Sequence, residues 1–371
     1  MGTAGWAPSC RCASRPRSPT PTKPAERAGT ACRQRVQLGR ILRPHVARPG
    51  FDARGISRVR RIERQATEAL MNMPVAPTLP ALPAPSRLRR LLDFGAVRLC
   101  LAFVVTALAG ALTARVLHAH TEGLLHALAP GFGGAAAALA VYLAYVRLVE
   151  GRSAGELARQ RALPELGIGL TGGAALVALV VAGLAAAGGY QFQGLNEHPG
   201  KLGAAFAEMV FAGVFEELLL RGIVLRILER SLGSGAALLL SSLLFGLMHL
   251  PGDGFSPLAM ATTVVAGLFL GAAFLATRRL WLCIALHTGW NFTLGSVFSV
   301  AVSGHGLPKG LLLGQLSGPD WLTGGSYGLE GSVLTLAVLL FASAGLLRIA
   351  VARHHLRARG QQQGASKIAQ R

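Results

Sequence analysis

Residues 210–225 read VFAGVFEELLLRGIVL, an apolar stretch that contains two adjacent glutamates and an arginine. A charged side chain at the centre of a membrane helix costs about 2.5–3.5 kcal/mol on insertion scales, so such residues persist only when they are paired, hydrated or needed. Glu217 and Arg221 are four residues apart, so they share one helix face and can pair. Glu216 points about 100° away from Glu217. The stretch therefore predicts a membrane helix with one unpaired carboxylate.

Apolar runs of similar length recur along most of the chain, and a helix needs about 20 residues to cross a bilayer. They lie near 95–117, 131–149, 168–188, 203–226, 235–250, 257–277, 280–299 and 332–350. The chain is 51% hydrophobic and only 15% charged, whereas a soluble domain carries about 25% charged residues. We therefore expect an all-α membrane protein, a polytopic bundle of about eight transmembrane helices with an intramembrane active-site cavity.

The placement of positive charge orients this bundle, because loops rich in Lys and Arg stay in the cytoplasm. Arginines precede the first run and follow the second, fourth, sixth and eighth runs, and the other loops are poor in positive charge. This pattern predicts that both termini are cytoplasmic. The bias towards Ala, Arg, Gly and Leu suits a GC-rich bacterial genome, so we expect an integral protein of the bacterial inner (plasma) membrane.

The first 92 residues differ from the rest. Positions 1–70 hold 15 Lys and Arg against 4 acidic residues, and prolines recur in 73–85. Such a segment cannot bury enough surface to offset the cost of ordering it, so we expect a disordered region. It is either an organelle transit peptide or, as we favour, an overextended start, with translation beginning near Met71 or Met73. Residues 93–352 then form the transmembrane domain, and 353–371 a basic cytoplasmic tail.

The net charge of +20 would suggest nucleic-acid binding in a soluble protein. Here the excess is concentrated in the N-terminal segment and beside the apolar runs, where it sets topology. We therefore expect no nucleic-acid partner. The expected partners are the lipid bilayer and a peptide or membrane-protein substrate.

Two more polar motifs lie in apolar runs. Phe245-Gly-Leu-Met-His249 ends the fifth run, and His287-Thr-Gly-Trp-Asn291 lies in the seventh. His287 and Asn291 are four residues apart and face the same way. Glu216 and His249 each lie roughly 21 Å from the turn that joins their helices, at 1.5 Å per residue. Three helices therefore bring polar groups to a similar depth.

Taken in order, the motifs Glu-Glu-x-x-x-Arg, Phe-x-x-x-His and His-x-x-x-Asn resemble those of the CAAX protease and bacteriocin-processing (CPBP) family, which includes the Ras-converting CAAX endopeptidases. The resemblance covers about 160–300, the expected protease core. It implies a peptide hydrolase that cleaves membrane-associated peptides or proteins. In that reading Glu216 activates a water with the help of His249, and His287 and Asn291 stabilise the oxyanion.

The resemblance also implies three supporting residues. Glu217 and Arg221 would hold the fourth helix in place, and Phe245 would pack beside His249. From the residues alone, the Glu217–Arg221 pair is more often a structural clasp than part of the chemistry.

A metal mechanism uses the same positions, because two histidines and a glutamate are also a catalytic zinc set with water at the open position. The ligands would be Glu216, His249 and His287. We favour a glutamate-type mechanism without a cofactor, since Asn291 suits an oxyanion donor better than a zinc ligand. The zinc alternative stays open.

Two other classes of protein compete with the endopeptidase. A transporter could use the same polar residues as an ion path, but it predicts inverted repeats, and the sequence has no convincing internal repeat. A non-catalytic scaffold or bacteriocin immunity protein is the other alternative. The intact set of motifs argues against lost catalysis, so the endopeptidase remains the leading hypothesis.

Overall fold

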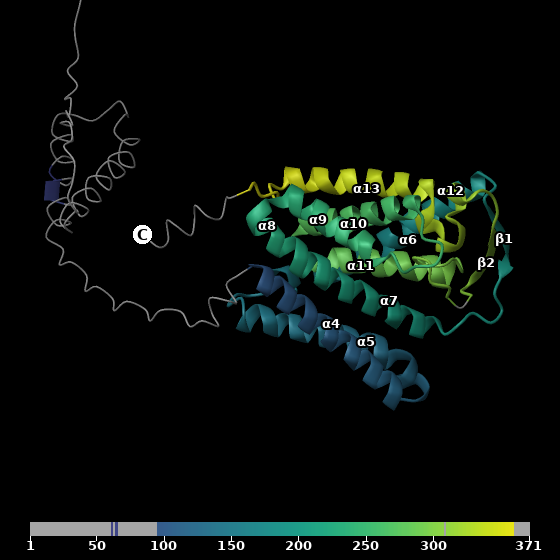
Figure 1. Ribbon diagram of the computed structural model, residues 1–371, viewed down its shortest axis with the longest axis horizontal. Coiled ribbons are helices and arrows are strands. Elements are labelled where there is room, and N and C mark those ends of the chain that lie inside the picture. Colours follow the sequence, from purple (N-terminus) through teal and green to yellow (C-terminus); the bar gives the residue numbers. More distant parts are fainter. Residues whose placement is uncertain (1–60, 62–63, 66–94, 308, 360–371) are drawn as a thin grey trace, which may run out of the picture. The chain divides into compact units, whose positions relative to one another are not determined.

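The computed structural model describes residues 61, 64–65, 95–307 and 309–359. Its helices are α4 (Gly95–His120), α5 (Gly123–Leu148), α6 (Ala162–Ala186), α7 (Leu202–Glu217), α8 (Arg226–Leu232), α9 (Ser234–Met248), α10 (Pro257–Thr277), α11 (Leu280–Phe292), the short α12 (Asp320–Thr323) and α13 (Val333–Ala352). Figure 1 shows them as a bundle of roughly parallel and antiparallel rods. The predictions for 1–92, including a start near Met71 or Met73, fall almost wholly outside the described residues, as does the tail from 360 to 371.

The predicted fold class is confirmed. Five helices, α4, α5, α6, α10 and α13, are long and apolar enough to cross a membrane, and α9 is a shorter apolar helix. The fourth predicted run is one continuous helical rod made of α7, the π-helical segment η3 (Leu218–Leu225) and α8. The seventh is α11 extended by the π-helical η4 (Thr293–Val297). Each of the eight predicted runs is therefore largely helical.

Two predicted boundaries are wrong. The second run was expected to begin at 131, but α5 begins at Gly123 and continues through Pro130. Proline removes one hydrogen bond from a helix interior but does not always end it. The third run was expected from 168, but α6 begins at Ala162. Arg161 before it has φ 62°, a left-handed conformation that sets the start of the helix.

Small residues let the helices that carry the motifs approach closely. A Cβ at Gly173 of α6 would meet the backbone of Leu286 and Trp290 in α11. A Cβ at Gly213 of α7 would lie 2.5 Å from Oγ1 of Thr288 in α11. Such contacts are typical of membrane helices, which associate through packing of small residues. They fix α11 against both α6 and α7 at the level of the polar motifs.

One end of the bundle carries a feature that the sequence did not predict, a two-stranded antiparallel sheet of β1 (Tyr190–Leu195) and β2 (Leu312–Leu316). β1 follows α6, and β2 lies in the segment between η4 and α13. Figure 1 shows the sheet at the end of the bundle opposite α8. The pairing ties two connections together that are more than 100 residues apart in sequence, and so closes that end of the bundle.

The other end gathers the arginine-rich loops into ion pairs. Arg226 Nη2 donates to Glu150 Oε1 at 2.7 Å, and Arg152 pairs with both Glu150 and Glu156. Burial alone would raise the pKa of the Glu150 carboxyl, but hydrogen bonds and charge from Arg226 and Arg152 outweigh it and hold that pKa below its usual value. The arginines that were expected to set topology therefore also join the loops to one another.

Candidate active site

Glu216 and Glu217, the adjacent glutamates of the fourth apolar run, point in different directions, as the helical period requires. Glu217 is fully buried, and its Oε1 accepts a hydrogen bond from Arg221 Nη1 at 2.7 Å. The same oxygen lies 3.0 Å from Nδ1 of His287 on α11. A carboxylate only accepts, so the Nδ1–H of His287 is the donor. Glu217 thus holds both the arginine of its own motif and the histidine of the third motif.

Arg221 joins three helices. It is fully buried, and its Nη2 donates to the carbonyl of Gly267 on α10 at 2.6 Å. Its guanidinium lies 5.0 Å from the ring centroid of Phe245 on α9, a cation–π contact. It stands within the π-helical η3, which begins directly after the two glutamates. Such irregular turns are frequent at functional sites.

Glu216 and His249 form the second glutamate–histidine contact. His249 Nε2 lies 3.8 Å from Glu216 Oε2, with 13% and 21% of the two side chains exposed. Glu216 Oε2 is buried and has no hydrogen-bond partner among the described residues. On the other side of the ring, Nδ1 lies 2.8 Å from the carbonyl of Phe245 and so donates to it. In the neutral ring, Nε2 therefore presents a lone pair towards Glu216.

Phe245 sets the plane of the His249 ring. The two rings stack with centroids 4.5 Å apart and an angle of 30°. Phe245 also lies beside His287, at 5.9 Å between centroids. The aromatic side chain thus stands between the two histidines, where it fixes both rings.

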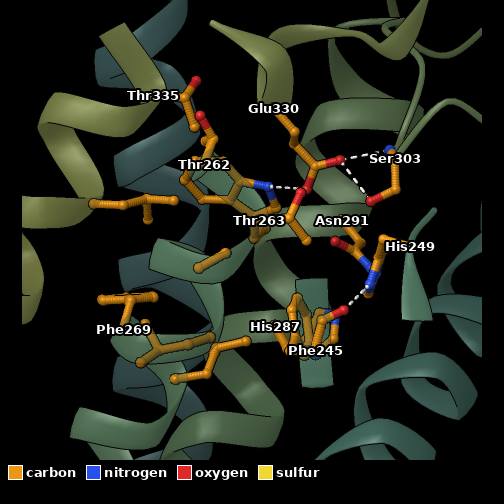
Figure 2. Close-up of a pocket in the computed structure, with 15 residues that line it drawn as sticks. Phe245, His249, Thr262, Thr263, Phe269, His287, Asn291, Ser303, Glu330 and Thr335 are labelled. Atoms are coloured by element: carbon orange, nitrogen blue, oxygen red, sulfur yellow. Dashed lines mark hydrogen bonds between the residues drawn. The ribbon is translucent and has the colours of Figure 1, made fainter. Parts of the chain in front are cut away.

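A pocket opens beside these groups. His249, His287 and Asn291 line it, and Glu216 does not; Glu216 reaches it only through His249. Asn291 is 8% exposed, and its side chain makes no hydrogen bond within the described part of the chain. Figure 2 shows Asn291 and His249 on the same side of the pocket. The amide of Asn291 is therefore free to bind a ligand there.

Sequence reasoning missed Glu330, in the short 3-10 turn η6 (Leu329–Gly331), which also lines the pocket. Its Oε1 accepts from Trp290 Nε1 at 3.0 Å, and its Oε2 accepts from the backbone N and the Oγ of Ser303 at 2.5 and 2.9 Å. An acidic residue just before an apolar run is usually exposed, so no motif marked Glu330. Glu330 reaches the site only because the chain between η4 and α13 folds back against Trp290 of α11.

A metal ion at this site would need a defined set of ligands. A catalytic zinc site uses three protein ligands at about 2.0–2.2 Å from the ion. Among the described residues, no group of three His, Cys, Asp or Glu side chains is placed to hold a metal ion. Glu216 and His249 do approach each other, and His287 donates its Nδ1–H to Glu217, which leaves Nε2 of its ring open. In this arrangement the described side chains therefore do not form a three-ligand zinc set.

The arrangement is an integral membrane helical bundle with two glutamate–histidine contacts beside one buried pocket. The family model of the Rce1-like type II CAAX prenyl endopeptidases matches residues 198–293. All seven residues singled out in the sequence lie in that segment. The match confirms the resemblance: over these residues the chain is similar to the type II CAAX prenyl endopeptidases. That family suggests a peptidase and implies a membrane-embedded peptide or protein substrate.

Comparison with curated proteins and with solved structures gave no match. The family match covers residues 198–293, which is a shorter stretch than the predicted core of about 160–300.

Proposed function

We propose that this chain is an intramembrane endopeptidase that cleaves membrane-associated peptides or proteins with a water activated by Glu216. The observation that carries the proposal is the contact of 3.8 Å between Glu216 Oε2 and His249 Nε2. Both atoms are acceptors when the glutamate is ionised and the histidine neutral, since Nδ1 of His249 already carries the proton donated to Phe245. A water between these two acceptors would donate one hydrogen to each, and the two side chains must part to admit it, because Oε2 has almost no water-accessible surface in this arrangement.

The chemical steps follow from these positions. Glu216 takes a proton from the water, and the water oxygen forms a bond to the scissile carbonyl carbon while the carbonyl π electrons move to its oxygen. His249 orients the water and then assists the return of the proton to the leaving amine. Collapse of the tetrahedral intermediate breaks the C–N bond and releases the two peptide products.

The oxyanion is assigned to Asn291 and His287, which both line the pocket. The side-chain amide of Asn291 does not ionise, so its NH2 group can always donate. His287 donates through Nε2 only when its ring carries both protons, because Nδ1 is directed to Glu217. The carboxylate of Glu217 beside Nδ1 is the partner that such a cation needs. Preorganised donors of this kind are usually the largest single contribution to acyl-transfer catalysis.

We also propose that the end of the bundle with the arginine pairs faces the cytoplasm, with both termini on that side of a bacterial inner membrane. The support is that Arg152 and Arg278, from two loops, and Arg226, the first residue of α8, all form ion pairs at this end of the bundle. Reporter fusions at each terminus would test this. An external location for either terminus would contradict the assignment.

The proposed activity is tested with the full-length protein purified in detergent and a broad panel of soluble and membrane-inserting peptides. Cleavage by the wild type is compared with that by Glu216→Gln and by Glu208→Gln, the same change at an exposed position of the same helix. We expect Glu216→Gln to lose at least about 10²-fold in kcat, with Glu208→Gln close to the wild type. Equal cleavage by wild type and Glu216→Gln would remove Glu216 from the mechanism.

The alternatives predict other outcomes of the same assay. If a chelator abolishes cleavage and zinc restores it, the enzyme is a metalloprotease. If no peptide is cleaved by the wild type, the non-catalytic scaffold or immunity protein becomes the better hypothesis. Proton or ion flux through reconstituted vesicles that depends on Glu216 would favour a transporter.

A further inference from the structure

The pocket beside the proposed oxyanion donors contains a carboxylate that the mechanism does not use. Among the described side chains that line it, Glu330 is the only Asp, Glu, Lys or Arg. Figure 2 shows Glu330 and Ser303 towards one edge of the pocket, and His287 and Phe269 towards the other. A substrate side chain in this pocket would therefore meet one full negative charge.

Glu330 is held in place by three hydrogen-bond donors, from Trp290 and from the backbone and side chain of Ser303. These three bonds fix the orientation of the carboxylate. Its two oxygens offer about four acceptor sites, so one remains for a substrate group. Glu330 thus provides a fixed charge rather than a mobile one.

The rest of the pocket sets the kind of side chain that fits. Phe269, Leu270 and Leu339 form apolar walls, and Thr262 and Thr335 add hydroxyl groups. Within the described part of the chain, no lysine or arginine lines it to balance the charge of Glu330. The buried Arg221 does not line the pocket and is already paired with Glu217.

Asn291 connects this pocket to the reaction. It is 8% exposed, has no side-chain partner within the described residues and lines the pocket. If Asn291 and His287 bind the scissile carbonyl oxygen, as the proposed function holds, the side chain of a residue that adjoins the scissile bond enters the pocket. This inference therefore rests on the proposed function.

We propose that the pocket is a substrate side-chain subsite that accepts an apolar or basic side chain and rejects an acidic one, with Glu330 as the residue that determines this charge selection. Like charges brought together in a site of low polarity are strongly unfavourable, and such repulsion is a common source of specificity. An acidic side chain that entered the pocket would also lose its hydration shell without gaining a positively charged partner.

The test begins with any peptide that the wild type cleaves, its cleavage site located by mass spectrometry. The two residues that flank the scissile bond are replaced, one at a time, by Leu, Lys, Asn and Asp, and kcat/KM is measured near pH 7. Asn and Asp have nearly the same shape, so their ratio reports charge. At one of the two positions we expect the Asp peptide to be cleaved at least about tenfold less efficiently than the Asn peptide.

Variants of the protein assign the effect. Glu330→Gln should bring the Asn-to-Asp ratio at that position towards one, whereas Glu330→Asp, which keeps the charge, should retain most of the discrimination. Glu208→Gln removes one negative charge outside the pocket and should leave the ratio unchanged. If Glu330→Gln does not fold, the wild-type ratio still tests the charge selection, and loss of that discrimination in Glu330→Asp would count against the role of Glu330.

Three results would count against the inference. Equal cleavage of Asn and Asp peptides by the wild type at both positions overturns the charge selection while leaving the protease intact. An unchanged ratio in folded Glu330→Gln removes Glu330 from it. Absence of cleavage of every peptide by the wild type rejects the proposed function and, with it, the subsite.

Discussion

His287 Nδ1 lies 3.0 Å from Glu217 Oε1, the carboxylate oxygen that also accepts from Arg221 at 2.7 Å. The two adjacent glutamates of the first motif are therefore divided between two histidines. Glu216 faces His249 of α9, and Glu217 faces His287 of α11. Glu217 does more than clasp its own helix, because it also orients a ring that lines the pocket.

The first prediction concerns the buried pair. Glu217→Gln leaves the Arg221 cation, which is 0% exposed, without its counter-charge. Removing one partner of a buried ion pair costs about 3–5 kcal/mol, whereas replacing both partners is often close to neutral. We expect Glu217→Gln to lower the unfolding temperature sharply and Glu217→Gln/Arg221→Met to recover most of it. Thermal unfolding of the detergent-solubilised protein measures both.

Exposed Glu208→Gln serves as the control and should unfold like the wild type. Arg221→Met alone completes the comparison. If the double variant loses as much stability as the sum of the losses in Glu217→Gln and Arg221→Met, then Glu217 and Arg221 are not energetically coupled.

The second prediction concerns Asn291, whose side chain is proposed to donate to the oxyanion. Asn291→Leu keeps the approximate size and removes the donor. Loss of one oxyanion-hole donor typically lowers kcat by about 10²–10³-fold, so we expect that loss with little change in KM or in unfolding temperature. Thr106→Val on α4, which alters a buried hydroxyl remote from the pocket, should keep full activity. A rise in KM alone would make Asn291 a substrate-binding residue instead.

Much of this arrangement could be predicted from spacing. The i,i+4 relation places Arg221 beside Glu217, and the equal distances from the turn place Glu216 level with His249; both contacts are present in the structure. These inferences succeed because the helical period and rise are fixed by backbone geometry. The second acceptor role of Glu217, towards His287, depends on how α7 and α11 rotate against each other. Spacing within one helix contains no information on that rotation.

The same limit explains why Glu330 was missed. It lies outside the apolar runs, and the long segment between η4 and α13 has no period from which its course could be predicted. Its path is set by tertiary contacts, such as the strand pairing of β1 with β2 and the hydrogen bonds from Ser303. The two-stranded sheet escaped prediction for a related reason, because strands that pair across more than 100 residues leave only a weak local pattern.

The third prediction tests the close approach of α7 and α11. Gly213 lies one helical turn before Glu217, and a Cβ there would meet Thr288 Oγ1 at 2.5 Å and the carbonyl of Ile284 at 3.1 Å. Gly213→Ala should push the helices apart, lengthen the contact between Glu217 and His287, and lower both unfolding temperature and activity. Overpacking of this kind typically lowers the free energy of unfolding by about 1–3 kcal/mol.

Thr288→Ala removes the nearest obstacle, so adding it to Gly213→Ala should restore part of the loss. Gly345→Ala provides the matched control, because a Cβ at that position of α13 meets nothing within 4 Å. It should be neutral or slightly stabilising, as Ala favours helices over Gly by about 1 kcal/mol. Equal effects of the two glycine changes would mean that the α7–α11 contact does not limit stability.

The fourth prediction concerns pH and the arginine-paired end of the bundle. Both oxygens of Glu229 accept from Arg278, at 2.6 and 2.9 Å, and Ser234 Oγ donates to Oε1. Burial would raise the pKa of the Glu229 carboxyl, but these hydrogen bonds and the charge of Arg278 outweigh it and lower that pKa. A carboxyl whose pKa is lowered by folding stabilises the protein above its unfolded pKa, about 4.3 for Glu. That contribution is lost as pH falls below this value.

We therefore expect Glu229→Gln to lower the unfolding temperature at pH 7 and to reduce the further fall between about pH 5 and pH 3. Below the folded pKa both proteins carry an uncharged side chain at this position, so their unfolding temperatures should converge. Glu208→Gln, exposed on α7, should instead follow the wild-type profile throughout. A constant gap between Glu229→Gln and the wild type from pH 7 to pH 3 would show that packing, rather than the ionised carboxylate, accounts for the stability that Glu229 provides.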